Sequence, residues 1–489
     1  MANHETIALT PTAPPAPVRR LAKVWISTVL ALFLVLVGLG IVMRLNQSAL
    51  ITLNNDFIYS LMTLHGLGMS GTLLASGLVI VWYLLSAREV RPYTTLMWIA
   101  YGLSMAGTAG LIVATMIGRF APGWYVLYPL PFVNPTWPAW ASGLAFVSLI
   151  VLGVSWLLVQ FSLLAAMARR YGFGHLLGWQ YFQRNGTPQE IPPIVLITTI
   201  SLLAGTIATL CGAVFLLLNL AQWGGLASGY DPLLMKNMVF LFGHTIVNIT
   251  MYLGIAAVYE VLPRFSGRSW PSNKIVVLSW NLALIFVLFA YFHHLYMDFV
   301  QPESFQYLGQ IASYASSVPA TVVTVFGVIG QVLHSGLKWR FIPIAFFLGI
   351  VGWVVGGFAA VIDSTIGVNS IFHNTLWVPA HFHTYFLMGY VLIALAMAYG
   401  VFYRESENVA RTSLVVMLLG GYGFLASFYV GGVFGIPRRY ASYSAMQIDA
   451  LSGLGSKLAL LAVVSALVFL AGFVIYLISL ALKPSAASD

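Results

Sequence analysis

Six histidines lie inside long apolar stretches of this 489-residue chain, where an ionisable side chain is costly and marks a candidate functional site. A neutral imidazole nitrogen is a good ligand for copper, iron and zinc, whereas hard cations prefer oxygen ligands. The pattern therefore predicts transition-metal centres at membrane depth. The six residues are His65, His244, His293, His294, His381 and His383.

The spacing of these histidines indicates more than one centre. Residues two apart on a helix project about 200° from each other, so His381 and His383 are expected to bind different centres. Adjacent residues project about 100° apart, so His293 and His294 can converge on one ion. His244, on another stretch, can supply the third ligand of that ion.

One arrangement uses every ligand. His65 and His383 hold one haem on both axial faces, and His381 holds a second haem on one face only. The metal bound by the remaining three histidines then lies opposite the open face of the second haem, which is where chemistry would occur. We expect this metal to be copper rather than iron, because no carboxylate is near enough to serve as a fourth ligand.

The elements that position these residues are predicted to be about twelve transmembrane helices. The chain is 60% hydrophobic and only 7% charged, against about 25% charged residues in a soluble domain. An apolar stretch of about 20 residues can cross a bilayer. Such stretches occur near 22–44, 57–86, 95–118, 138–168, 196–224, 237–262, 274–297, 307–334, 341–366, 374–403, 412–436 and 453–482.

The fold class expected is therefore an all-α integral membrane protein. We predict a polar tail over 1–21, one twelve-helix membrane domain over 22–482 and a short C-terminal tail over 483–489. The single cysteine, Cys211, falls inside an apolar stretch, so no disulfide framework, cysteine-based copper centre or C-x-x-C-H haem attachment is expected.

The formal net charge of +9 indicates orientation rather than a nucleic-acid partner. The basic residues gather on the loops of one side, which the positive-inside rule assigns to the cytoplasm together with both termini. We expect the surrounding membrane to be a prokaryotic plasma (inner) membrane. The basic residues are Arg19, Arg20, Lys23, Arg88, Arg91, Arg169, Arg170, Arg184, Arg264, Arg268, Lys274, Lys338, Arg340, Arg404, Arg411 and Lys483.

Counting residues from the outer ends of the spans places all six histidines at a similar depth. At about 1.5 Å per residue they lie within roughly 15 Å of the outer surface. Any one of them could be a hydrogen-bonded core histidine, but unrelated core residues would not be expected to agree in depth. Arg438 and Arg439, in the run GIPRRY, fall at the same level and could pair with haem propionates; an ordinary interfacial arginine pair is the alternative.

At this point the chain resembles the catalytic subunit of the haem–copper oxidase superfamily over nearly its whole length. The runs LHGLGMSG, FGHTIVN, FHHLY, FHNTLWVPAHFH and GIPRRY occur in that family's order, and the forms HNTLWVPAHFH and SSVPATVVTVF look more like its B-type branch. The resemblance implies a low-spin haem on His65 and His383, an active-site haem on His381 and a non-haem metal on the other three. It also implies that Arg438, Arg439 and His373 contact propionates.

One residue departs from this pattern. A-type and B-type oxygen reductases have a tyrosine, cross-linked to the first metal histidine, four residues after it, and this chain has Asn248 there. The C-type branch carries its tyrosine one or two turns before the histidine pair, where this chain has Phe286 and Val287. Tyr291 is two residues before His293 and is expected to point away.

The missing tyrosine favours nitric oxide as the substrate. Breaking the O–O bond in one step needs the electron and proton that the tyrosine supplies. Coupling two molecules of nitric oxide to nitrous oxide and water takes only two electrons and two protons. The resemblance therefore implies a nitric oxide reductase related to B-type oxidases, with Asn248 positioning an oxygen atom or acting as a polar filler. A cytochrome c oxidase that reduces oxygen to water is the alternative.

Protons must reach the site along polar side chains. We expect a path from the cytoplasm that resembles the single B-type path, although small hydroxyls on membrane helices also serve helix packing. Glu260, about sixteen residues and roughly 24 Å from His244 along the helix, is too far away to coordinate the metal. The path residues are Tyr252, Tyr259, Glu260, Ser316, Ser317, Thr321 and Thr324.

Electrons must come from outside the chain. We expect a partner subunit with a copper or c-type haem centre on the outer face, and cytochrome c or a small copper protein as the reductant.

Two other classes of protein are alternatives. A twelve-span secondary transporter could use histidines to relay protons, but it would leave the shared depth unexplained. A passive electron-transfer module would not need the three-histidine cluster.

Overall fold

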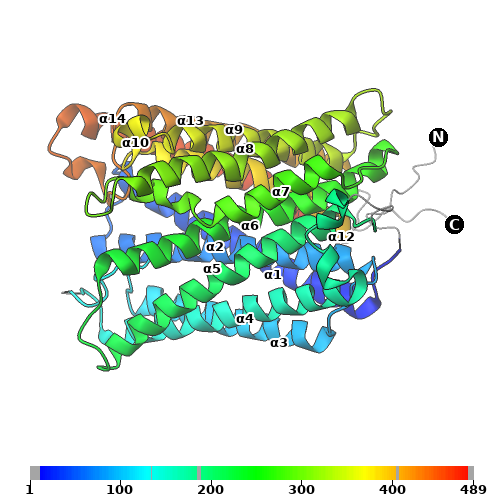
Figure 1. Cartoon of the computed structure of the whole chain (residues 1–489). Helices are drawn as coiled ribbons and strands as arrows, with labels where there is room; N and C mark the ends of the chain where they lie inside the picture. The colour runs from blue at the N-terminus through cyan, green and yellow to red at the C-terminus, as the bar shows by residue number, and fades with distance from the viewer. Residues whose placement is uncertain (1–11, 134, 184–188, 403–406, 483–489) are drawn as a thin grey trace.

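The computed structural model describes residues 12–133, 135–183, 189–402 and 407–482, and this part of the chain folds into a bundle of long helices (Figure 1). Twelve of the described helices are long and apolar enough to cross a membrane, which confirms the predicted fold class. No β-strand occurs among these residues. Arg184, Arg404, Lys483 and most of the two predicted tails lie outside the described ranges.

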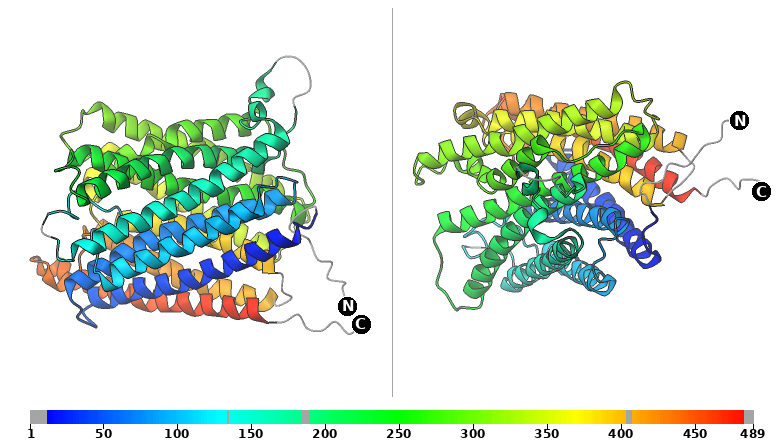
Figure 2. Two further views of the ribbon diagram at one scale, coloured as in Figure 1. Left: turned by 90° about the horizontal axis from the view of Figure 1, so that it is seen from below. Right: turned by 45° about the vertical axis from the view of Figure 1, so that its right-hand side comes forward.

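The long helices lie side by side in all views, with α3 and α4 at one edge and α8 and α9 at the opposite edge (Figures 1 and 2). Short connections join them. The helices are α1 (Ala16–Gln47), α2 (Asn55–Ser86), α3 (Thr94–Ile112), α4 (Ala139–Tyr171), α5 (Pro193–Trp223), α6 (Pro232–Ser266), α7 (Lys274–Val287), α8 (Ser304–Val332), α9 (Phe341–Asp363), α10 (Ile366–Phe372), α11 (Trp377–His383), α12 (Val391–Phe402), α13 (Glu407–Val433) and α14 (Asp449–Ala481).

Side-chain caps fix the starts of several helices. Asn54 accepts a hydrogen bond from the Asp56 backbone N–H at the start of α2, and Asp231 accepts one from the Leu234 N–H at the start of α6. Helix α1 begins at Ala16, inside the segment expected to be a polar tail, because prolines at its first turn need no donor there.

The spans that carry most of the histidines are the most deeply enclosed. In the hydrophobic windows of α2 and of Trp377–Phe402, 72% of the residues are buried, and the figure for α6 is 67%. In the windows of α3 and α8 at the edges it is 28%. The bundle therefore surrounds the candidate ligands with protein rather than with lipid.

Three of the twelve spans are not regular α-helices throughout. Helix α3 continues into a π-helical segment, η1 (Val113–Ile117). Helix α7 ends at Val287 and is followed by a 3-10 segment, η4 (Ala290–Leu295). Between α11 and α12 the backbone forms a π-helical segment, η5 (Thr384–Tyr390). The spans were predicted, but these irregular turns were not, because contacts with neighbouring helices outweigh the local preference for α-helix.

The π-helical segment η5 packs tightly against glycines of α9. A Cβ atom at Gly352 would collide with the Met388 carbonyl, and one at Gly356 would lie 2.6 Å from the Tyr385 nitrogen. Only glycine lets the two backbones approach so closely. The shape of η5 therefore depends on α9 as well as on its own sequence.

Candidate active site

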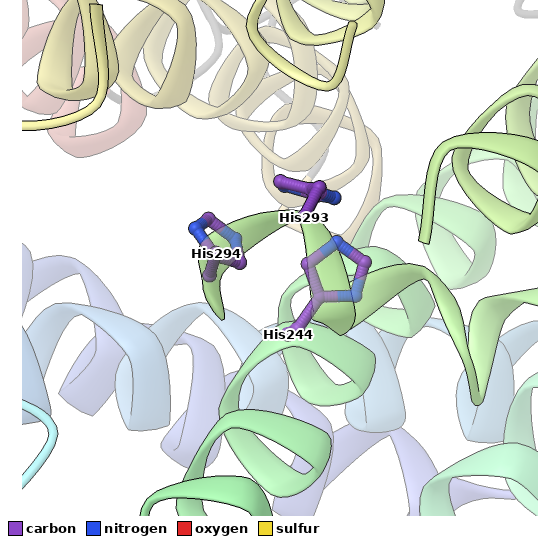
Figure 3. Close-up of side chains that lie close together, drawn as sticks. All are labelled: His244, His293 and His294. Atoms are coloured by element: carbon purple, nitrogen blue, oxygen red, sulfur yellow. The ribbon is translucent and has the colours of Figure 1, made fainter. Parts of the chain in front are cut away.

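Three histidines meet at one point inside the bundle. His244 comes from α6, and His293 and His294 come from η4 (Figure 3). One nitrogen from each ring lies within 4.8 Å of those from the other two. Three neutral imidazoles at one point form a donor set that suits copper, zinc or iron.

Two of these rings have a nitrogen atom left free for a metal. The Ser313 hydroxyl donates to the Gly309 carbonyl (2.6 Å), so its oxygen accepts a hydrogen bond from His293 Nδ1 (2.9 Å). Because Nδ1 then carries the hydrogen of the neutral ring, the lone pair of His293 Nε2 is free. His244 Nδ1 is buried without any hydrogen-bond partner. A buried nitrogen with no partner is costly in an apolar interior, and coordination of a metal would satisfy it.

His65 on α2 and His383 at the end of α11 are oriented in the same way as each other. His65 Nδ1 lies 2.8 Å from the Leu36 carbonyl oxygen, and His383 Nδ1 lies 2.6 Å from that of Pro379. A carbonyl only accepts, so both Nδ1 atoms carry hydrogen and both Nε2 atoms are free to bind iron. A Cβ atom at Gly40 would lie 3.1 Å from His65, so α1 approaches this ring closely.

All six histidines line one cavity of about 450 Å³. His381 Nε2 has no hydrogen-bond partner and lies 3.6 Å from Asp363 Oδ2, a buried carboxylate at the end of α9. The cavity wall is mostly apolar, with Phe33, Phe424 and Phe469 among its residues. Such a wall, with nitrogen ligands facing into it, fits large flat apolar groups such as two haems.

Three arginines give this cavity a cationic rim. Arg438 and Arg439 line it, and Arg44 of α1 lines it as well, although no sequence motif marks Arg44. Burial, followed by the charge of neighbouring Arg439, lowers the pKa of the Arg438 guanidinium to about 9. Arg438 Nε has no partner. A propionate carboxylate would satisfy this nitrogen and compensate the charge.

His373, in contrast, is not among the residues that line the cavity, and its contact with a propionate stays a prediction. It lies between α10 and α11. Burial, and then the charges of Arg438 and Arg439, lower its pKa to about 4. His373 is thus close enough to both arginines for their charges to act on it.

Asn248 lies beside the metal-ligand cluster. Its Nδ2 donates to the His244 carbonyl (2.9 Å) and lies 3.4 Å from His244 Nε2. The Tyr385 hydroxyl, from η5, donates to Asn248 Oδ1 (3.3 Å), and both side chains line the cavity. Sequence reasoning missed Tyr385, because no motif marks it and its direction depends on the π-helical backbone. Tyr291 donates to Asn237 (3.1 Å) and does not line the cavity.

The residues expected to carry protons separate into two groups. Tyr252, Ser316, Ser317 and Thr321 line the cavity, and the Tyr252 hydroxyl is 3.5 Å from the Ser316 carbonyl oxygen. The other three residues, Tyr259, Glu260 and Thr324, do not line the cavity.

In this second group, the Tyr259 hydroxyl is 3.2 Å from Thr324 Oγ1. The buried Glu260 carboxylate pairs with Arg88 (2.9 Å) and Arg264 (3.6 Å). This ion cluster links the turn after α2 to α6, and the role of Glu260 in the proton path stays a prediction.

Comparison with known proteins gives a consistent picture. The family model described as cytochrome C and quinol oxidase polypeptide I matches residues 20–464. Cytochrome c oxidase subunit 1 of Thermus thermophilus is 26% identical over 423 residues, which cover 80% of this chain and 70% of that protein. Quinol oxidase subunit 1 of Sulfolobus acidocaldarius is 24% identical, over 87% and 83% of the two chains.

A solved structure of a heme–copper terminal oxidase dimer has the same fold. Its TM-score to this chain is 0.79 at 20% sequence identity, and the match covers 97% of this chain and 86% of the other. At this identity the likeness supports the fold alone. It agrees with the twelve spans found here.

Proposed function

Because the chain belongs to the cytochrome c and quinol oxidase polypeptide I family, we propose that it is the catalytic subunit of a respiratory terminal reductase that reduces nitric oxide to nitrous oxide. The observation that carries the choice of substrate is Asn248. A neutral amide, rather than a phenol, lies one turn beyond His244 and within 3.4 Å of its ring.

The proposed reaction joins two molecules of nitric oxide with two electrons and two protons to give nitrous oxide and water. When bound, the two haems and the non-haem metal would supply the electrons. His65 and His383 would hold the low-spin haem, His381 the high-spin haem, and the three-histidine cluster the non-haem metal. Copper is favoured, because no carboxylate belongs to the cluster among the described residues.

The chain's own residues would bind and orient the reactants. The Asn248 amide can donate a hydrogen bond to an oxygen atom beside His244, and the apolar cavity wall excludes bulk water. Arg438, Arg439 and Arg44 would hold propionates. A path of polar side chains would bring protons to the cavity. It would run from Glu260, Tyr259 and Thr324 to Tyr252, Ser316, Ser317 and Thr321 at the cavity wall.

Oxygen reduction is the second candidate. It is favoured by the names of the relatives, which are cytochrome c and quinol oxidases. It is also favoured by the Tyr385 hydroxyl, which places a phenol on the cavity wall even though residue 248 is not a tyrosine. The twelve-span transporter gains no support from the family match.

The electron donor is proposed from the chemistry of the chain. The donor set contains histidine but no cysteine, so electrons would enter from a partner subunit with a copper or c-type haem centre, reduced by cytochrome c or a small copper protein. By the distribution of basic residues, the site would lie nearer the outer face of a prokaryotic plasma membrane.

The deciding experiment is anaerobic turnover of the purified complex with a reduced donor. Nitric oxide loss and nitrous oxide formation are followed beside a parallel oxygen-uptake assay. We expect rapid nitrous oxide formation and slow oxygen uptake. Fast reduction of oxygen to water, with little nitrous oxide, would overturn the proposal in favour of the second candidate.

A further inference from the structure

We propose that Tyr385 is a positioning residue of the reduction site and that it acts through Asn248. The proposal rests on the proposed function only for the identity of the substrate. The family match and the histidine pattern did not draw attention to Tyr385. The structure brings its hydroxyl to the wall of the cavity, where it donates to Asn248 Oδ1.

Tyr385 reaches this position because of the backbone that carries it. It is the second residue of η5, two residues beyond His383. Gly356 of α9 lies directly behind its backbone nitrogen. The side chain is buried, and its hydroxyl makes the hydrogen bond to Asn248 across the site, from η5 to α6.

Two hydrogen bonds together fix which end of the Asn248 amide faces the site, because the His244 carbonyl can only accept. Asn248 Oδ1 accepts from Tyr385, and Nδ2 donates one hydrogen to the His244 carbonyl. When the unpartnered His244 Nδ1 binds the metal, the neutral ring carries its hydrogen on Nε2, which then cannot accept from the amide. The second N–H of Asn248 is therefore available to an oxygen atom of the substrate.

Loss of the Tyr385 hydroxyl would leave Asn248 Oδ1 without its partner, and only the bond from Nδ2 to the His244 carbonyl would then restrict rotation of the amide. The donor would then point toward the substrate for only part of the time. Because a hydrogen bond that strengthens during the reaction affects the rate more than ground-state binding, kcat should fall while KM changes little.

The first test compares Tyr385→Phe with Tyr390→Phe. Tyr390 is a matched control, because it lies on the same segment, is fully buried and has its hydroxyl 2.7 Å from Ser76 Oγ, but it does not line the cavity. We expect Tyr385→Phe to shift the stretching frequency of carbon monoxide bound to the reduced protein and to lower kcat about tenfold. Tyr390→Phe should change neither.

The second test asks whether Tyr385 acts through Asn248. In an Asn248→Leu background the amide is gone, so adding Tyr385→Phe should change kcat and the carbon monoxide frequency no further. Should Tyr385→Phe fail to bind haem, Tyr385→Met gives a second variant without a hydroxyl, because methionine adapts to irregular space.

An unshifted carbon monoxide frequency in both Tyr385 variants, or an independent effect of Tyr385→Phe in the Asn248→Leu background, would overturn the inference. The carbon monoxide frequency does not depend on which gas is reduced during turnover. A protein that forms no nitrous oxide but shows the shift would therefore contradict the proposed function and leave the role of Tyr385 intact.

Discussion

The candidate ligands lie on two kinds of backbone. His65, His244, His381 and His383 lie within the α-helices α2, α6 and α11, whereas His293 and His294 lie on the 3-10 segment η4; the π-helical segment η5 begins directly after His383. On α6, ideal spacing predicts neighbours correctly: Asn248, four residues after His244, lies against it. On the irregular segments the rotation per residue differs, about 120° in a 3-10 helix.

This difference shows where the site is set by local sequence and where it is set by tertiary contacts. The regular helices need only their own hydrogen bonds to direct a side chain. The irregular segments are held by other helices, by Ser313 of α8 at His293 and by Gly352 and Gly356 of α9 at η5. Irregular helical turns are frequent at functional sites because they re-aim side chains.

The largest effect is expected when a metal ligand is removed, whether the ligand lies on regular α6 or on η4. His244→Ala and His293→Ala should each lose the non-haem metal and lower turnover by at least about a thousandfold, because the metal contributes several kcal/mol to catalysis. Metal content by mass spectrometry and turnover are measured together. His175→Gln, outside the cavity, should keep both. Retained metal in either alanine variant would remove that histidine from the ligand set.

The second prediction separates the two regions. Ser313→Ala removes the acceptor that orients His293 and should weaken metal affinity about tenfold to a hundredfold. Thr245→Val, beside His244 on regular α6, removes a buried hydroxyl that has no partner and should leave the affinity unchanged. Equal affinities of the two variants in a metal titration would show that η4 needs no support from α8.

The third prediction concerns stability. Gly352→Ala forces α9 away from the Met388 carbonyl and should lower the free energy of unfolding by about 2 kcal/mol. Gly102→Ala in α3 has open space around it and should not destabilise, since alanine favours helix. Thermal unfolding in detergent measures both. A Gly352→Ala protein as stable as the Gly102→Ala protein would mean that η5 does not depend on close packing with α9.

The smallest expected effect, counted per pH unit, is a pH dependence from His373, which lies in the connection before α11. Its pKa is about 4 in the folded protein, mainly because of burial, against about 6.5 in an unfolded chain. The unfolded state therefore binds more protons between these values, so stability falls as the pH drops from about 6.5 to about 4, by up to about 1.4 kcal/mol per pH unit. His373→Gln should flatten that slope in melts at several pH values, and an unchanged slope would exclude His373 as its source.

Much of the architecture follows from the sequence, because long apolar stretches and intramembrane histidines carry strong signals. The twelve spans were predicted within a few residues at most of their ends, and the three histidines of two separate stretches do meet. Tyr385 could not be found this way, since its direction depends on η5. Arg44 was missed because its approach to the cavity depends on how α1 packs, and the ion pairs of Glu260 depend on the contact of α2 with α6.

The hydrogen bond from His65 to the Leu36 carbonyl links two helices, whereas that from His383 to Pro379 stays within one. An accepting carbonyl makes an imidazole more basic and a better electron donor to a bound iron, which lowers the reduction potential of that iron. The electron-donating strength of His383 is thus fixed by its own turn of helix. That of His65 depends on the position of α1, so a displacement of α1 would change the reduction potential of an iron bound to His65.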